Sequence, residues 1–481
     1  MTTLQKTEDD YRAFIERKTH LGNQSGFKPL FMPDFLFPFQ RALVEWAVMK
    51  GRAAIFADCG LGKTPMQLVW AQNVVEKTCK PVLILTPLAV APQTVREAAK
   101  FGIEAKQSRD GKVAAPITVA NYEQLHKFDP SEFSGLVCDE SSILKHFTGA
   151  TQKQVTRFMT KLPYRLLCTA TAAPNDYTEL GTSSEALGEL NYTEMLHRFF
   201  RQLDDKGQKQ ELKKQANNEK AAKHFQRLAF RVSQTISQWR LKNHAHEYFW
   251  KWVCSWAKAC RKPSDIGFSD AGYILPELIE RDHVIQPATP PEGMLFTLPA
   301  IGLQEERDER RRTMKERCEL VASLVNHDRP AVVWCHMNQE GKRLTAEING
   351  AKEISGATPD DEKEELYEAF QSGQLRVLVT KPKIGAWGLN WQHCNHVVTF
   401  ASHSFEQYYQ SIRRCYRFGQ KRPVTLDVIS TEGEVGVRRS MARKKHQAEA
   451  MFSELVKHMN DALRIERPDR HTQKMELPKW I

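Results

Sequence analysis

A glycine-rich segment near residue 60 has the pattern AxxGxGKT, in which a lysine and a threonine follow two closely spaced glycines. The segment reads Ala57-Asp58-Cys59-Gly60-Leu61-Gly62-Lys63-Thr64. An apolar run at residues 53–56 precedes it, and apolar side chains at helical spacing follow it. The pattern therefore predicts a buried strand, a tight turn and a helix, which is the setting of a phosphate-binding loop in an α/β fold.

In such a loop the backbone N–H groups and the helix N-terminus favour an anion. We expect the loop to bind the phosphates of ATP, with Lys63 reaching the β- and γ-phosphates and Thr64 holding Mg²⁺. The predicted nucleotide-binding residues of the loop are Asp58, Cys59, Gly60, Leu61, Gly62, Lys63 and Thr64. For this motif taken alone, the alternative is a glycine-rich turn that binds nothing.

Two adjacent carboxylates, Asp139 and Glu140, lie at the end of another apolar run. At the carboxyl end of a strand beside the loop, Asp139 would hold Mg²⁺ and Glu140 would polarise the attacking water. The alternative is a helix-capping role for Glu140 and a turn at Asp139. Catalysis is favoured because the spacing suits a strand of the same sheet, and the two carboxylates would otherwise be desolvated without compensation.

A basic segment at residues 410–420 has the pattern QxxxRxxRxGQ. Phosphoryl transfer needs positive charge where negative charge develops, and Arg414 and Arg417 could supply it from one face if the segment is helical. Hydrolysis would then require closure of two parts of the chain, whereas a basic surface helix is the alternative for this segment alone. The predicted catalytic residues are Lys63, Asp139, Glu140, Arg414 and Arg417, with Thr64 and Asp139 as the Mg²⁺ ligands.

The chain has 481 residues, which is too long for one ordinary hydrophobic core. Short apolar runs alternate with helical patterns in two series, which predicts an α/β fold with two parallel-sheet lobes. The runs lie at residues 53–56, 82–86, 117–120, 136–139 and 165–169, and at residues 331–335, 352–355, 376–380, 396–400 and 424–429. We expect a first lobe at 1–180, a mainly helical insertion and connector at 181–300, a second lobe at 301–455 and a tail at 456–481.

The alternation breaks within residues 181–300. Residues 202–226 are rich in Lys, Gln, Glu and Asn, which predicts an exposed helix or a mobile insertion. An aromatic concentration follows, for which a helical subdomain packed on the first lobe is favoured over base stacking. Its members are Trp239, Phe249, Trp250, Trp252 and Trp256. Four prolines at residues 287–299 then predict an irregular connector, and a protein partner would dock on this insertion.

Charge and composition favour an acidic polymer as partner. Lys and Arg number 69 against 58 Asp and Glu, a formal net charge of +11, which suits nucleic acid. The ten cysteines include no CxxC pair and no zinc-type Cys/His grouping, so reduced thiols are expected. The N-terminus lacks the apolar segment of a signal peptide, and no stretch approaches membrane-spanning length. We expect a cytoplasmic monomer with no membrane partner.

With these motifs, the chain resembles the superfamily 2 helicase-type ATPases of the SWI/SNF, or chromatin-remodeller-like, group over about residues 35–455. Gln40 stands where such proteins carry an adenine-reading glutamine, and Thr86 begins a segment similar to their first nucleic-acid-contacting motif. Residues 169–175 resemble the TGTPxxN motif, and Gly388 and Asn390 belong to a GLN-type motif of the second lobe. The resemblance adds Gln40, Gly388 and Asn390 to the expected nucleotide-binding residues.

The resemblance implies RecA-like lobes, ATP and Mg²⁺ as cofactors, and double-stranded DNA gripped across both lobes by its phosphates. Thr86 and Thr380 would track one strand, and ATP-driven opening and closing would move the protein along duplex DNA without strand separation. The alternatives are a helicase that unwinds RNA or acts on single-stranded DNA, and a non-catalytic nucleic-acid-binding module. Because no appended domain is visible, the resemblance favours a compact motor encoded by a bacterium or a phage, acting in the bacterial cytoplasm or nucleoid or in an infected host.

Several positions depart from the family's patterns. Ser141 and Ser142 follow the acidic pair in place of the usual residues, and Ala170 replaces a glycine of the third motif. Trp387 stands where the family usually has a small residue, and Arg413 occupies a usual glycine position before Arg414. None of these changes removes a group that the resemblance assigns to the chemistry.

Overall fold

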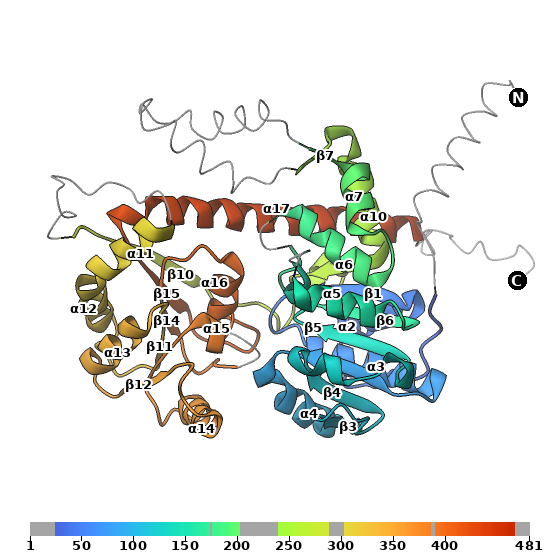
Figure 1. Cartoon of the computed structure of the whole chain (residues 1–481), viewed down its shortest axis with the longest axis horizontal. Helices are drawn as coiled ribbons and strands as arrows, with labels where there is room; N and C mark the ends of the chain where they lie inside the picture. The colour runs from blue at the N-terminus through green and yellow to red at the C-terminus, as the bar shows by residue number, and fades with distance from the viewer. Residues whose placement is uncertain are drawn as a thin grey trace, which may run out of the picture.

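The computed structural model describes residues 25–145, 147, 149–173, 176–202, 239–287, 303–385 and 390–466. Within these residues the chain forms two α/β lobes, each built around a fully parallel sheet (Figure 1). The predicted fold class of two parallel-sheet lobes is therefore confirmed. Two predicted features lie outside the described residues: the polar insertion, apart from its first residue, and the proline-rich connector beyond residue 287.

The first sheet has seven strands in the order β3-β4-β2-β5-β6-β1-β9. They are β1 (Arg52–Ala57), β2 (Val82–Thr86), β3 (Ala105–Gln107), β4 (Ile117–Asn121), β5 (Gly135–Asp139), β6 (Tyr164–Cys168) and β9 (Ala257–Cys260). Five of them match the predicted runs, and their side chains are almost all buried, as expected for a parallel sheet covered on both faces. Only β6 separates the strand that leads into the phosphate loop from the strand that ends in the acidic pair.

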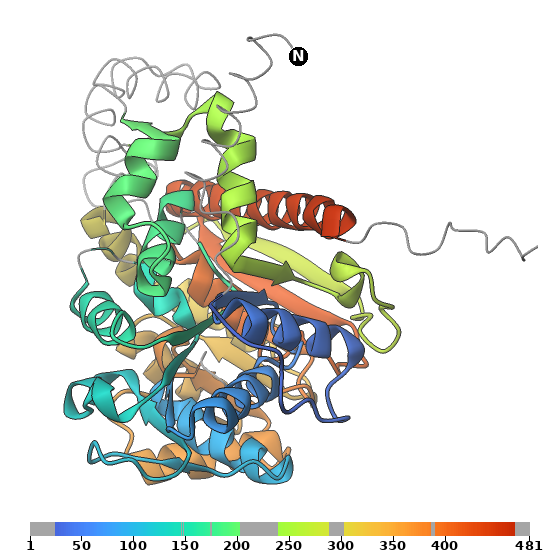
Figure 2. The ribbon, with the colours of Figure 1, turned by 90° about the vertical axis from the view of Figure 1, so that its right-hand side faces the viewer.

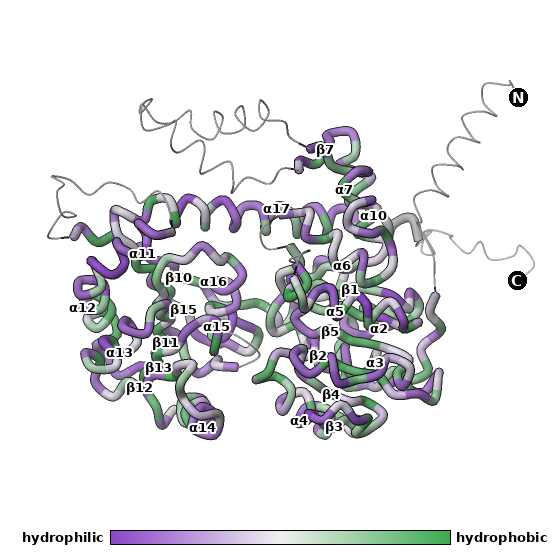
Figure 3. The backbone as a smooth tube through the Cα atoms, in the orientation of Figure 1, coloured by the Kyte–Doolittle hydropathy of each residue, from purple (hydrophilic) through white to green (hydrophobic). Residues whose placement is uncertain are grey.

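The second sheet has six strands in the order β10-β15-β14-β11-β13-β12. They are β10 (Leu278–Ile285), β11 (Ala331–Trp334), β12 (Ala351–Ile354), β13 (Val377–Thr380), β14 (His396–Phe400) and β15 (Val424–Thr431). All five runs predicted for this lobe form strands. The tube coloured by hydropathy shows hydrophobic stretches along strands of both lobes and a more hydrophilic periphery (Figure 3).

Helices cover both sheets. Those of the first lobe are α2 (Pro38–Lys50), α3 (Lys63–Thr78), α4 (Ala91–Lys100), α5 (Ala150–Met159), α6 (Leu180–Leu187), α7 (Tyr192–Phe199) and α10 (His246–Trp256). Those that follow are α11 (Leu303–Arg312), α12 (Met314–Leu324), α13 (Asn338–Glu347), α14 (Asp360–Gln371), α15 (Pro382–Gly385), α16 (Phe405–Ile412) and α17 (Val435–Glu466). In the part of the chain that is described, no helix combines the length and apolar character needed to cross a bilayer.

The described part of residues 181–300 contributes to both lobes. The tryptophans of α10 are buried in the core of the first lobe, which confirms packing over base stacking for Trp250, Trp252 and Trp256. A short antiparallel pair, β7 (Phe200–Gln202) with β8 (Trp239–Leu241), precedes this helix. The same region also supplies an edge strand to each sheet, β9 to the first and β10 to the second.

Helix α17 runs along both lobes (Figure 1), and Figure 2 shows it passing beside α10. It packs against α16 of the second lobe and against α10 and β9 of the first. Met451, Leu455 and Met459 are part of the hydrophobic core of the first lobe, although the helix begins beside the second. One continuous helix therefore joins the two lobes in addition to the connector.

Candidate active site between the lobes

The phosphate loop lies between the end of β1 and the start of α3. Gly60 and Gly62 have φ angles of 91° and 76°, a left-handed region that favours glycine. A Cβ on Gly60 would lie 2.8 Å from the backbone nitrogen of Phe418, and one on Gly62 would lie 2.3 Å from Nε2 of Gln40. Because no side chain caps the N-terminus of α3, its first N–H groups are left for an anion, which fits a nucleotide phosphate.

Lys63 is the first residue of α3, and Thr64 follows it. The Nζ of Lys63 donates a hydrogen bond to the carbonyl oxygen of Ala57, 3.1 Å away. Burial alone would lower the pKa of Lys63, but the neighbouring Cys59, Glu140 and Asp139 raise it above its ordinary value. The lysine is thus a permanent cation beside the acidic pair, as a triphosphate site requires.

Asp139 ends β5 and faces the loop helix, because Nε2 of Gln67 on α3 donates to its Oδ1 at 2.7 Å. Burial, and next the charge of Glu140, raises the pKa of Asp139 to about 6. Glu140 has a φ of 51°, rare for a residue with a side chain, and its Oε2 accepts a bond from the hydroxyl of Thr169. Two buried carboxylates beside Lys63 fit a site for a divalent cation, and Thr64 and Asp139 stay the predicted ligands.

The turns that carry the predicted arginines lie against the same loop. Helix α16 ends at Ile412, so Arg414 and Arg417 lie in the turns that follow the helix, not on one helical face. Arg414 is buried, with its Nε donating to the carbonyl oxygen of Gln410. Burial, and next Arg414, lowers the pKa of Arg417, whereas Cys59 and Glu140 of the first lobe oppose this shift. The Cβ of Arg417 would lie 3.5 Å from a Cβ on Gly60, so it lies against the loop.

Arg413, which the motifs did not assign, makes an ion pair between the second lobe and the loop. Nη2 of Arg413 lies 2.6 Å from Oδ2 of Asp58, and the hydroxyl of Tyr409 donates to Oδ1 of Asp58 at 2.5 Å. Asp58 therefore bonds to the second lobe through both carboxylate oxygens. The sequence signalled Arg413 only as an unusual residue before Arg414, and nothing in it indicated Tyr409.

The expected adenine-reading residue, Gln40, contacts the loop directly. Its Nε2 donates to the carbonyl oxygen of Leu61 at 2.9 Å, and its Oε1 accepts from the backbone nitrogen of Phe37. Phe37 is 49% exposed, and Tyr273 packs between it and Phe418, with ring centroids 5.6 and 4.5 Å away. An aromatic surface thus borders the loop on the side of Gln40, which suits a nucleobase.

The second-lobe GLN-type motif is described only in part. Gly388 and Trp387 lie outside the described residues, as do the last two residues of the TGTPxxN-like segment. Asn390 is described, and its Nδ2 lies 3.4 Å from Oε1 of Gln392. Asn390 therefore contacts Gln392, in the segment that precedes β14 and the arginine turns. The role of Gly388 stays a prediction.

The two threonines expected to track a DNA strand are both fully buried. The hydroxyl of Thr380 donates to the carbonyl oxygen of Ile354 at 2.9 Å, so this side chain joins β13 to β12 and does not face a ligand. Polar residues after the neighbouring strands are more accessible: Lys381 bonds to Asn338, and Ser355 and Thr358 form a small loop. The expectation that the Thr380 side chain contacts a DNA strand was wrong, because Thr380 still belongs to β13 and its hydroxyl is bonded within the sheet.

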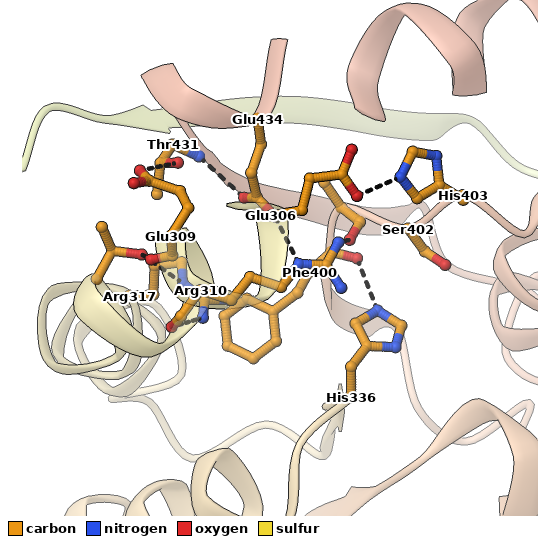
Figure 4. A network of polar contacts seen from close by, with 12 residues as sticks. Glu306, Glu309, Arg310, Arg317, His336, Phe400, Ser402, His403, Thr431 and Glu434 are labelled. Atoms are coloured by element: carbon orange, nitrogen blue, oxygen red, sulfur yellow. Dashed lines mark hydrogen bonds and ion pairs between the residues drawn. The ribbon is translucent and has the colours of Figure 1, made fainter. Parts of the chain in front are cut away.

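A polar network covers the carboxyl ends of β14 and β15 (Figure 4). Arg310 on α11 donates to Glu434 and to the carbonyl oxygen of Ala401, both at 2.7 Å, and Nη2 of Arg317 donates to the carbonyl oxygen of Arg310. Burial, and next Arg310, lowers the pKa of His336 to about 4, so its imidazole is neutral at pH 7. The network binds α11 and α12 to the carboxyl ends of β14 and β15.

Breaking the buried ion pair of this network should destabilise the second lobe. Arg317 and Glu340 are both fully buried and lie 2.8 Å apart. Replacing Glu340 with glutamine leaves an uncompensated buried cation, so we expect the opening free energy of β11 to fall by about 3–5 kcal/mol. Hydrogen exchange of the β11 amides measures this locally.

The matched control is Glu347→Gln, which removes one of the two ion-pair partners of the more exposed Arg343 and should cost less than about 1 kcal/mol. Equal protection of β11 in Glu340→Gln and in the unchanged protein would contradict a structural role for the pair.

Comparisons with known proteins find similarity in the part of the chain that includes the arginine turns. Residues 314–419 match the family model of the helicase conserved C-terminal domain. A Caenorhabditis elegans protein, the SWI/SNF-related matrix-associated actin-dependent regulator of chromatin subfamily A containing DEAD/H box 1 homolog, is 32% identical over 120 residues. That match covers 24% of this chain and 12% of the relative.

The bifunctional helicase and thymine dioxygenase JBP2 of Leishmania braziliensis is 39% identical over 87 residues, which cover 18% of this chain and 8% of that protein. The chain thus matches only a small part of the length of these curated relatives. Among solved structures, the Sulfolobus solfataricus SWI2/SNF2 ATPase core in complex with dsDNA aligns with 91% of this chain and 98% of its own, at 16% identity and a TM-score of 0.40. By the family model, residues 314–419, which include β11 to β14 and the arginine turns, are similar to the conserved C-terminal domain of helicases.

Proposed function

We propose that this protein is a DNA-dependent ATPase of the SWI/SNF type that moves along double-stranded DNA. The observation that carries the proposal is the meeting of three groups in one place: the phosphate loop, the acidic pair and the arginine turns of the other lobe. A site divided between two lobes in this way responds to the angle between them, because hydrolysis needs all three groups together.

Each group has a separate task in the proposed reaction. Lys63 and the N-terminus of α3 bind the phosphates of ATP, and Glu140 orients and polarises the attacking water. Mg²⁺ held by Thr64 and Asp139 would neutralise phosphate charge. Arg414 and Arg417 stabilise the charge that develops on the transferred phosphoryl group. Gln40 and the exposed ring of Phe37 bind the base.

The net charge of +11 supports an acidic polymer as the second ligand. The accessible polar residues after β11, β12 and β13 include Asn338, Ser355 and Lys381, which suit sequence-independent contacts with phosphates. The names of the matched relatives, a regulator of chromatin and a helicase, favour DNA as that polymer. Opening and closing of the lobes would then advance the protein along the duplex.

The proposal predicts that duplex DNA stimulates ATP hydrolysis more than single-stranded DNA or RNA does. The measurement compares steady-state turnover with the three polymers at equal phosphate concentration and salt, because binding to phosphates weakens steeply with salt. A triplex-displacement assay on duplex DNA then reports movement without requiring strand separation.

Lys63→Ala is the control for contaminating ATPases and should show no stimulation. Stronger stimulation by RNA or single-stranded DNA would favour an unwinding helicase. Turnover at background with every polymer would favour a non-catalytic binding module.

A further inference from the structure

Helix α16 is bonded to the first lobe at both ends, and neither bond belongs to the predicted catalytic set. Near its start, Glu406 forms an ion pair with Lys145, which ends the 3₁₀ helix η4 (Ser141–Lys145) after the acidic pair. Near its end, Tyr409 and Arg413 bond to Asp58 in the phosphate loop. The helix therefore lies across the acidic segment and the loop together.

The contact with Asp58 is buried and specific. The side chains of Arg413 and Asp58 are 14% and 6% exposed, and Oδ1 of Asp58 also accepts from the backbone nitrogen of Cys59 at 2.6 Å. Burial alone would lower the pKa of Arg413, but Asp58, and after it Tyr409, together raise that pKa above its ordinary value. A buried ion pair with further hydrogen bonds has the geometry needed to offset desolvation.

Residues of the second lobe also hold the guanidinium of Arg413 in place. The guanidinium of Arg413 lies over the rings of Tyr409 and Tyr416, 5.0 and 5.2 Å from their centroids. Its Nη1 also donates to the carbonyl oxygen of Tyr416. Stacking between two rings suits the planar guanidinium of arginine and does not suit an ammonium group equally well.

We propose that Asp58, Tyr409 and Arg413 form an interlobe latch that docks the second lobe on the phosphate loop and positions Arg414 and Arg417 for hydrolysis. Arg413 directly precedes Arg414 in the chain, and the same turns continue to Arg417 and Phe418. The backbone nitrogen of Phe418 would lie 2.8 Å from a Cβ on Gly60. Fixing Arg413 on Asp58 therefore fixes these turns against the loop.

The latch also couples the phosphate loop to the second lobe, so that movement of either one affects the other. Asp58 follows β1 directly and lies two residues before Gly60, so a shift of the loop on nucleotide binding moves the carboxylate that holds the second lobe. Arg413, Tyr409 and Tyr416 border a cavity of about 220 Å³ between the lobes, which leaves room for the arginine to move when the bond breaks. The positioning role rests on the proposed ATPase function, whereas the docking role does not.

The first test measures the distance between the lobes without nucleotide. Cys79 is exposed on the first lobe while the other nine cysteines are buried, so it and Lys352→Cys on the second lobe can carry a donor and an acceptor dye. We expect Arg413→Gln and Asp58→Asn each to reduce the ratio of closed to open molecules by about fivefold or more. The double variant should lose no more than either single variant, because both changes remove the same bond.

Arg343→Gln is the matched control, since it removes another ion-paired arginine of the second lobe and should leave the distance distribution unchanged. A distribution for Arg413→Gln equal to that of the unchanged protein would overturn the latch. Additive losses in the double variant would overturn the pairing with Asp58.

The second test separates positioning from binding. Arg413→Gln should lower kcat with DNA and ATP and change KM for ATP much less, and Arg413→Lys should restore only part of kcat because it keeps the charge without the planar stacking. An unchanged kcat in a variant with open lobes would overturn the positioning role. If the unchanged protein hydrolyses no ATP with any polymer, the proposed function fails, while the distance measurement still decides the docking role.

Discussion

Glu140→Gln is expected to reduce ATP turnover by about 10²–10⁴-fold while leaving nucleotide binding largely intact. Glu140 is buried beside Lys63 and at the end of the strand that carries Asp139, and its carboxylate is the group assigned to the attacking water. Glutamine keeps the size and the hydrogen bond from Thr169 but cannot accept a proton. Single-turnover hydrolysis and binding of a fluorescent nucleotide measure the two effects separately.

The matched control is Glu123→Gln, which changes an exposed glutamate of the same lobe on the 3₁₀ helix η2 (Tyr122–Lys127). This variant should hydrolyse ATP as fast as the unchanged protein does. Vigorous hydrolysis by Glu140→Gln would falsify the assignment of the acidic pair. Loss of nucleotide binding together with turnover would instead indicate that Glu140 maintains the loop.

Arg417→Ala is expected to reduce kcat by about 10³–10⁵-fold, which is the range for an arginine that stabilises the charge of a transferred phosphoryl group. The Cβ of Arg417 lies against Gly60, and the charge of Glu140 in the first lobe acts on the guanidinium. Because this charge matters mainly in the transition state, the affinity for ATP should change far less than kcat.

The control for this prediction is Arg422→Ala, an exposed arginine just beyond the same segment, whose Nη2 donates to the carbonyl oxygen of His393. It should retain turnover. An equal loss of kcat in both variants would show that the segment needs its arginines for folding and not for the reaction.

The strands were readable from the sequence where both faces of the sheet are covered. The runs at residues 82–86 and 396–400 were predicted with the bounds that the structure shows, because a buried parallel strand is apolar along its whole length. Strand β10 escaped prediction since it is an edge strand with three consecutive charged residues, Glu280, Arg281 and Asp282. Only its pairing with β15, across more than a hundred residues, identifies it.

The candidate site was predictable to the extent that each group follows a strand or belongs to a known pattern. Lys63, Asp139 and Glu140 could be placed together because parallel strands end at one edge of a sheet. The contact of Asp58 with Tyr409 and Arg413 could not be predicted, because it depends on how the two lobes pack together. Tyr409 and Arg413 follow Asp58 by 351 and 355 residues along the chain. The burial of Thr380 was missed for a related reason: its bond partner belongs to the neighbouring strand.

The long helix α17 restricts how the two halves of the molecule can separate. A rod of 32 residues that is embedded in the core of one half and packed on α16 of the other cannot lengthen, because its backbone bonds are satisfied internally. The halves can therefore swivel about this rod or slide against it, but they cannot simply part. If ATP drives the proposed movement, a swivel about this helix would be part of each cycle, and the size of the swivel would contribute to how far the protein advances.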